Sequence, residues 1–145
     1  MARTSTYLNF PRETEAAFLF YRSVFGGDFL PPGVQRFRDM PASPDQPPLS
    51  DEDGNLVLHV ELAITGGHVL MGTDAPPSMG FTVVQGSNVS LNVEPDSLAE
   101  GERLFAALSS GGTVEMPLTE MFWGATFGSL IDPFGIRWMI NVPKR

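Results

Sequence analysis

The chain has 145 residues, 42% of them apolar and 18% charged, so it can bury one core or two small paired cores. Nine basic and seventeen acidic residues give a net charge of -8, which argues against binding to nucleic acid or to an anionic membrane. The sequence has no cysteine, which excludes disulfides, cysteine metal sites and a thiol nucleophile. With no apolar run of membrane-spanning length and no apolar leader at the start, we expect a cytoplasmic globular protein.

The first part of the chain predicts a strand and then a helix. Residues 3–10 alternate around apolar side chains, as a strand does, and Pro11 suits the first position of a helix. Apolar residues at three- and four-residue steps continue this helix to Gly26-Gly27. Residues 28–37 predict at best an irregular strand, and the prolines and acids of 38–54 predict a loop.

A hairpin follows this loop. Residues 55–65 alternate between an apolar face, with Leu58, Val60 and Leu62, and a second face with Val57, His59 and Glu61. Gly66-Gly67 predicts the turn and 68–74 the returning strand. A three-residue loop pairs Glu61 with Met71. The prolines and glycines of 75–87 indicate a linker.

The second half repeats this order of elements. Ser97 and Glu100 form a capping box that starts a helix, which Gly111-Gly112 ends. The expected strands are 88–94, 113–119, 124–132 and 136–143, with a turn at Asp-Pro-Phe-Gly between the last two. Tyr7–Phe10 corresponds to Ser90–Val93, and Leu62–Met71 to Leu130–Met139. Each half therefore predicts a strand, a helix and three further strands.

A duplicated βαβββ module resembles the vicinal oxygen chelate superfamily, which includes glyoxalase I, bleomycin-resistance proteins and extradiol dioxygenases. The resemblance is greatest to its PhnB-like branch. It is carried by YLNF…EAAFLFYRSVFGG at 7–27, HVELAITGGHVLMGTDAPPSMGF at 59–81 and LFAALSSGGTVEMPLTEMFWGATFGSLIDPFGIRWMIN at 104–141. Members of this branch often bear the label 3-demethylubiquinone-9 3-methyltransferase. The sequence has no glycine-rich strand-to-helix turn to hold S-adenosylmethionine, so we do not expect methyl transfer.

The resemblance implies an α+β fold for residues 1–145, with module 1 at 1–75, a linker at 76–87 and module 2 at 88–145. Two curved mixed sheets face each other around a concave cup that binds the ligand. Such proteins are commonly homodimers, with modules paired within or between chains.

Strand alternation assigns faces, because the apolar face of each strand must pack on a helix while the other face lines the cup. Phe122 and Trp123 precede Gly124 at the expected mouth of the cup, where they would stack on a ligand or form a dimer contact. The candidate ligand-binding residues are Tyr7, Asn9, Met71, Asn88, Ser90, Asn92, Trp123, Phe127, Arg137 and Met139.

The metal-dependent relatives carry four histidine, glutamate or glutamine ligands, and the resemblance places these positions at Ser5, Met71, Asn88 and Met139. None is a histidine or a carboxylate. Thioethers are poor ligands for zinc, nickel, iron or manganese ions, and methionines in an apolar cup usually serve packing. We therefore expect no metal and no other cofactor, and we do not carry over glyoxalase or dioxygenase activity.

His59 and Glu61 are the candidate catalytic residues. They lie two apart on one strand, so both side chains project the same way, and a carboxylate beside an imidazole favours its use as a general base. Three alternatives stay open: a polar wall contact, a solvent-facing pair, and a displaced metal site that lacks an evident third ligand. Arg137 would bind an anionic group of a ligand or pair with Glu61.

Two functions follow from these residues. The first is metal-independent binding or sequestration of a small apolar or aromatic molecule in the cup. The second is an enzyme of the lyase, isomerase or oxygenase kind, with His59 as base and Glu61 or Arg137 orienting the substrate. The missing metal ligands favour the first.

Overall fold

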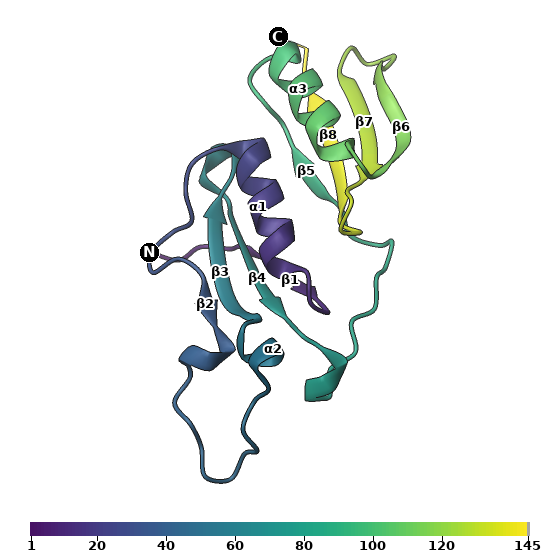
Figure 1. The fold of residues 1–145 in the computed structure, drawn as a ribbon. Coiled ribbons are helices and arrows are strands. Elements are labelled where there is room, and N and C mark those ends of the chain that lie inside the picture. The colour runs from purple at the N-terminus through teal and green to yellow at the C-terminus, as the bar shows by residue number, and fades with distance from the viewer. Residues whose placement is uncertain (145) are drawn as a thin grey trace. The chain divides into compact units, whose positions relative to one another are not determined.

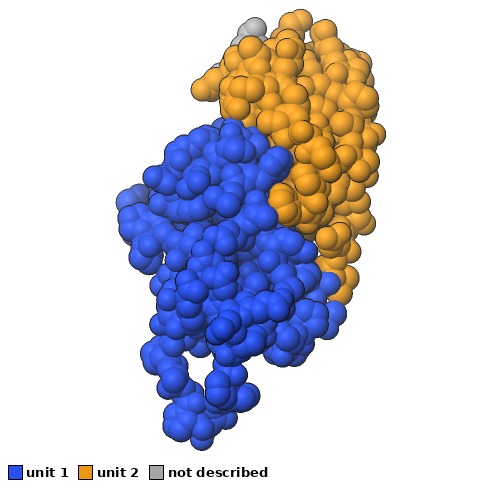
Figure 2. All heavy atoms as spheres, in the orientation of Figure 1, with its two compact units in different colours: residues 1–83 blue, residues 84–145 orange. Residues whose placement is uncertain are grey.

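The computed structural model describes residues 1–144 and divides the chain into two compact units, residues 1–83 and 84–145 (Figure 2). The division lies inside the segment expected to be a linker. Each unit has its own sheet and its own long helix, and each is described by itself (Figure 1). Among the described residues, no helix combines the length and apolar character needed to cross a membrane.

Unit 1 holds a four-stranded sheet in the order β1-β4-β3-β2, in which β1 runs parallel to β4 and the other pairs are antiparallel. A 3₁₀ turn follows the second strand at Phe37–Asp39, and another follows the fourth at Pro77–Met79. The named elements are β1 (Thr6–Phe10), α1 (Thr14–Phe25), β2 (Gln35–Arg36), α2 (Asp51–Gly54), β3 (Val57–Ala63) and β4 (Val69–Asp74).

Unit 2 repeats this arrangement, with sheet order β5-β8-β7-β6 and a parallel pair formed by β5 and β8. Its elements are β5 (Leu91–Val93), α3 (Leu98–Ser109), β6 (Thr113–Glu120), β7 (Thr126–Ile131) and β8 (Arg137–Val142). The two four-stranded mixed sheets, each with one long helix, confirm the α+β fold of two βαβββ modules.

Each long helix packs on one face of its sheet and forms the core there (Figure 1). In unit 1, Phe18 and Tyr21 of α1 are fully buried together with Val60, Leu62 and Leu70 of the strands. In unit 2, α3 buries Leu104 and Leu108, and the strands beneath bury Leu130, Trp138 and Ile140. These strand residues are the apolar faces that alternation predicted.

The start of α1 differs from the prediction, because the helix begins at Thr14 and Pro11 lies outside it. A buried carboxylate explains the shift. Asp74 Oδ1 accepts the backbone N–H of Thr14 at 3.0 Å, and Oδ2 accepts that of Val57 at 2.8 Å. Free N–H groups at a helix start need such acceptors. Asp74 thus joins the end of β4 to the starts of α1 and β3.

Half of the predicted capping box at α3 forms. The hydroxyl of Ser97 accepts the backbone N–H of Glu100 at 3.1 Å, as an N-cap residue does. The carboxylate of Glu100 pairs with Arg103 one turn further on. The helix ends at Ser109, just before the predicted Gly111-Gly112.

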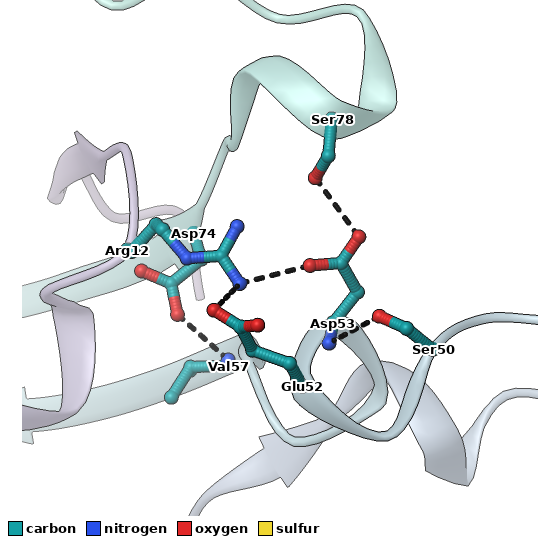
Figure 3. A network of polar contacts seen from close by, with 7 residues as sticks. All are labelled: Arg12, Ser50, Glu52, Asp53, Val57, Asp74 and Ser78. Carbon is teal, nitrogen blue, oxygen red and sulfur yellow. Dashed lines mark hydrogen bonds and ion pairs between the residues drawn. The ribbon is translucent and has the colours of Figure 1, made fainter.

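The predicted loop 38–54 is anchored at its end by a polar network around α2 (Figure 3). Arg12 donates to Asp53 Oδ1 at 2.8 Å and to Glu52 Oε1 at 3.1 Å. Ser78 donates to the other oxygen of Asp53 at 2.9 Å, and Ser50 caps the short helix by accepting the N–H of Asp53. The hydrogen bond from Arg12 lowers the pKa of Asp53, and the one from Ser78 adds to that lowering. This charged cluster joins three segments distant in sequence.

Candidate functional site

The candidate site lies on the face of the unit 1 sheet opposite α1, which we call the open face of unit 1. His59 and Glu61 project from β3 onto it, whereas Val60 and Leu62 between and beyond them are fully buried. This confirms the predicted alternation over most of the strand. Val57 and Leu58 depart from it: Val57 is buried and Leu58 is half-buried, at the end of β3 where the β2–β3 register shifts.

Three strands bring side chains into one row on the open face. Met71 on β4 is the register partner of both Tyr7 on β1 and Glu61 on β3. The predicted Glu61–Met71 pairing is therefore confirmed, and the loop Thr65–Gly67 has the predicted three residues. Gly66 and Gly67 have φ values of 72° and 81°, which favour glycine there.

His59 connects this row through both of its ring nitrogens. Nε2 lies 2.9 Å from Glu61 Oε2, and Nδ1 lies 3.3 Å from the Tyr7 hydroxyl oxygen. The Tyr7 and His59 rings are 5.7 Å apart between centroids, with a 41° tilt. About a quarter of each of the His59 and Glu61 side chains is exposed, at 26% and 24%. The pair is therefore shielded in part but remains reachable from solvent.

Arg3 completes the row at the far side of Glu61. Its Nη2 donates to Glu61 Oε1 at 3.3 Å, so the two carboxylate oxygens have different partners. The hydrogen bond from His59 lowers the pKa of Glu61, burial opposes this, and the bond from Arg3 lowers it further. Glu61 is thus held as a carboxylate, which can only accept hydrogen bonds.

Sequence reasoning placed Tyr7, His59 and Glu61 on one face but missed Arg3. The signal was available, because the alternation that puts Ser5 and Tyr7 on this face also includes Arg3. Asn9 follows on the same strand, exposed and opposite the buried Leu8 and Phe10.

In module 1, Ser5 and Met71 stand at the two positions where the metal-dependent relatives carry ligands, and here these two side chains contact each other. The hydroxyl of Ser5 lies 3.7 Å from the sulfur of Met71, which is a weak hydrogen bond between neutral groups. Within residues 1–144, no three histidine or carboxylate side chains come together as a metal-binding cluster. The residues at this position do not suit a divalent cation, and the absence of metal stays a prediction.

The ligand-binding candidates of module 2 lie within unit 2. Asn88, Ser90 and Asn92 are exposed on or before β5, and Phe127 and Met139 are half-buried on β7 and β8. Met139 is the register partner of both Asn92 and Ser129, as Met71 is of Tyr7 and Glu61. The two sheets therefore carry a methionine at corresponding places, and the ligand role of these residues stays a prediction.

Arg137 has partners that the sequence did not indicate. Its Nη1 lies 2.6 Å from Glu115 Oε1, and its Nε donates to the carbonyl of Gly86 at 3.3 Å. Glu115 on β6 is thus the carboxylate beside Arg137, whereas Glu61 contacts His59 and Arg3. A hollow of about 240 Å³ lies here, lined by Gln85, Gly86, Ser87, Ile131, Gly135 and Arg137.

Phe122 and Trp123 lie in the turn between β6 and β7. Phe122 is 98% exposed and Trp123 is 55% exposed. The rings contact each other edge to face, with centroids 4.8 Å apart. Their predicted contact with a ligand or a second chain stays a prediction.

Several known proteins are similar to this chain over nearly its whole length. The family model described as 3-demethylubiquinone-9 3-methyltransferase matches residues 2–141. Protein YjdN of Escherichia coli is 31% identical, over 97% of this chain and 95% of YjdN. The crystal structure of protein PA1353 from Pseudomonas aeruginosa is 32% identical, covers 100% of both chains and has a TM-score of 0.82.

A crystal structure of a glyoxalase/bleomycin resistance protein/dioxygenase family enzyme from Burkholderia phytofirmans shares the fold. It is 24% identical, covers 94% of this chain and 96% of its own, and has a TM-score of 0.58. The fold is thus that of the glyoxalase/bleomycin resistance protein/dioxygenase structures. The chain belongs to the family described as 3-demethylubiquinone-9 3-methyltransferase, the label expected for the PhnB-like branch, so the predicted family is confirmed.

Proposed function

We infer that this protein binds a small apolar or aromatic molecule without a metal ion, and that the open face of unit 1 forms part of its binding site. The row of Arg3, Glu61, His59 and Tyr7 carries this proposal. Binding sites combine apolar surface with a few polar groups held in fixed directions. This row supplies those polar groups, and the rings of Tyr7 and His59 supply the apolar surface.

The chemistry of Met71 supports a ligand of this class. It lies between Tyr7 and Glu61 in the sheet and is partly exposed. A thioether is polarizable and makes favourable contacts with aromatic rings. An aromatic ligand on this face would contact the thioether with its ring and the hydrogen-bonded row with its polar group.

The family description alone does not lead us to propose methyl transfer. The turn from β1 to α1 consists of Pro11, Arg12 and Glu13, and the turn from β5 to α3 of residues 94–97. Neither carries the glycines of a nucleotide-binding strand-to-helix turn.

A second candidate function is general-base catalysis by His59 in a lyase, isomerase or oxygenase reaction. It is favoured by the Nε2–Glu61 distance of 2.9 Å, since a carboxylate orients an imidazole and stabilises its protonated form. The other ring nitrogen, Nδ1, faces Tyr7. A substrate would therefore pass its proton to Nδ1 through the Tyr7 hydroxyl, or would displace that hydroxyl and contact Nδ1 directly. Turnover of the methylglyoxal–glutathione hemithioacetal by purified protein would favour this function over simple binding.

The binding proposal is tested by nuclear magnetic resonance with methionines labelled at their methyl groups. Metal-free bleomycin, indole and p-cresol are the probes. We expect at least one to shift the Met71 methyl signal in a saturable manner, and His59→Ala to weaken that binding while its melting temperature changes little. Asp45→Ala, in the exposed loop, is the matched control and should bind as the wild type does.

Two results would overturn the proposal. One is a Met71 signal that none of the three probes moves. The other is elemental analysis of gently purified protein showing about one nickel, zinc, iron or manganese ion per chain, as in a loaded metal site.

A further inference from the structure

The row on the open face fixes where its protons lie. The Glu61 carboxylate can only accept, so the Nε2 of His59 that faces it must carry a hydrogen. A neutral imidazole has one N–H, which leaves Nδ1 without a hydrogen. The Tyr7 hydroxyl, 3.3 Å from Nδ1, must then donate its proton to the ring.

This arrangement determines what Tyr7 offers to a ligand. Its only hydrogen points toward His59, so the oxygen presents lone pairs to the open face and acts there as an acceptor. Tyr7 is 49% exposed, the most accessible of the residues in direct contact with His59. Glu61, whose oxygens face His59 and Arg3, is less accessible, with 24% of its side chain exposed.

We propose that the Tyr7 hydroxyl oxygen is the recognition atom of this site and that it selects aromatic molecules carrying a hydrogen-bond donor, the phenol class. This rests on the binding function proposed above and narrows its ligand. The ring of such a molecule lies against the Tyr7 and His59 rings and the Met71 thioether, while its O–H donates to Tyr7. Glu61 is a positioning residue, because it sets the His59 hydrogens and through them the direction of the Tyr7 hydroxyl.

Protonation of His59 reverses this selection. The imidazolium donates from both nitrogens, so Nδ1–H donates to Tyr7 and the Tyr7 O–H turns toward the ligand. The charged and titratable groups that face His59 are Tyr7 from β1 and Glu61 from β3, with Arg3 behind Glu61. Met71 and Thr73 of β4 and Gln35 of β2 are uncharged. The imidazolium form of His59 therefore does not favour phenol-class ligands over ligands that only accept hydrogen bonds.

Phenol and anisole form the probe pair, because they share a ring and only phenol donates a hydrogen bond. At a pH where the nitrogen-15 shifts of the ring show His59 to be neutral, we expect phenol to bind three- to tenfold more tightly than anisole, roughly one hydrogen bond. The ratio should fall to about one in Tyr7→Phe. Thr6→Val removes the neighbouring hydroxyl, which contacts His68, and should leave the ratio unchanged.

Nitrogen-15 spectra of the histidine rings give a readout that folding alone does not move. The chain has two histidines, so His68 is an internal reference. We expect hydrogen on Nε2 and none on Nδ1 when the His59 ring is neutral. Glu61→Gln presents an amide that can donate or accept, so both tautomers of His59 should appear and the preference for phenol should fall.

The outcomes separate this proposal from the one on which it rests. Equal binding of phenol and anisole to the wild type, with shifts at Met71 and His59, overturns the role of Tyr7 and leaves the binding function standing. A neutral His59 ring with its hydrogen on Nδ1 also overturns it. If neither phenol nor anisole moves these signals while metal-free bleomycin or indole moves the Met71 signal, the selection of phenols is wrong and the binding function stands.

Discussion

Asp132 and Trp138 are joined by a buried hydrogen bond, in which the indole Nε1 of Trp138 donates to Asp132 Oδ2 at 2.9 Å. The other carboxylate oxygen accepts the backbone N–H groups of Phe134 at 2.8 Å and Ile136 at 3.1 Å. One carboxylate thus shapes the turn between β7 and β8 and orients the largest core side chain of unit 2. The Asp-Pro-Phe-Gly stretch therefore has a structural role in the fold.

Replacing Asp132 with alanine should lower the free energy of unfolding by about 2–4 kcal/mol, because three donors lose a charged acceptor in a buried place. Asp132→Asn should lose less, since its amide oxygen can still accept from one side. Urea denaturation followed by circular dichroism measures both. Asp45→Ala in the exposed loop is the control, with an expected change within about 0.5 kcal/mol. Equal stability of the Asp132 and Asp45 variants would contradict the assigned role.

Gly72 lets α1 approach the sheet, and Gly72→Ala should be destabilising by about 1–3 kcal/mol. A Cβ at this position would lie 2.3 Å from Cε1 of Phe18, whose ring is buried and has little room to move. Gly86→Ala is the matched control, because the nearest atom to its Cβ is Asn88 Oδ1 at 3.5 Å. Thermal melts of the two variants should differ clearly, and indistinguishable melts would show that α1 shifts freely.

The Glu61 carboxylate should make stability depend on pH on the acid side. Its pKa in the folded protein is lowered by His59 and Arg3, so its contribution is complete above the unfolded carboxyl pKa of about 4.3. It is lost as the pH falls through the folded pKa. The difference in unfolding free energy between the wild type and Glu61→Gln should therefore be steady near neutrality and shrink in acid. Glu102→Gln, exposed on α3, corrects for removal of a charge alone. A difference in unfolding free energy that grows in acid would contradict the lowered pKa of Glu61.

A homodimer that buries Phe122 or Trp123 remains a prediction from sequence, and their exposure in the single chain is compatible with it. Sedimentation at micromolar concentration should give about twice the chain mass of 15.8 kDa for the wild type. Phe122→Ser combined with Trp123→Ser should shift this toward the monomer. Val89→Ser, at another exposed apolar position of unit 2, should not. A wild-type monomer would remove the basis for the interface.

The parts of the fold that depend on the two-residue alternation of strands and on the length of a loop could be predicted from the sequence. Alternation identified Val60, Leu62 and Leu70 as core, and the loop length gave the pairing of Glu61 with Met71. Both depend on neighbours within a few residues, so the local sequence determines them. The duplicated order of elements extended the same reasoning to unit 2.

Features set by distant partners could not be predicted. The start of α1 depends on Asp74, which is 60 residues from Thr14, and the end of loop 38–54 on the bond from Arg12 to Asp53, 41 residues away. In the candidate site, alternation gave the face of His59 and Glu61. It could not give the order of contacts from Arg3 to Tyr7, because that order depends on side-chain reach across three strands.

The aromatic residues are divided between the units in a way that makes their folding separable. Both tyrosines, Tyr7 and Tyr21, belong to unit 1, and both tryptophans, Trp123 and Trp138, belong to unit 2. Tryptophan fluorescence thus reports the second unit, with one buried and one exposed indole, and tyrosine absorbance reports the first. Comparing the two signals during one titration shows, without any added label, whether the halves of this duplicated chain unfold as a single cooperative body.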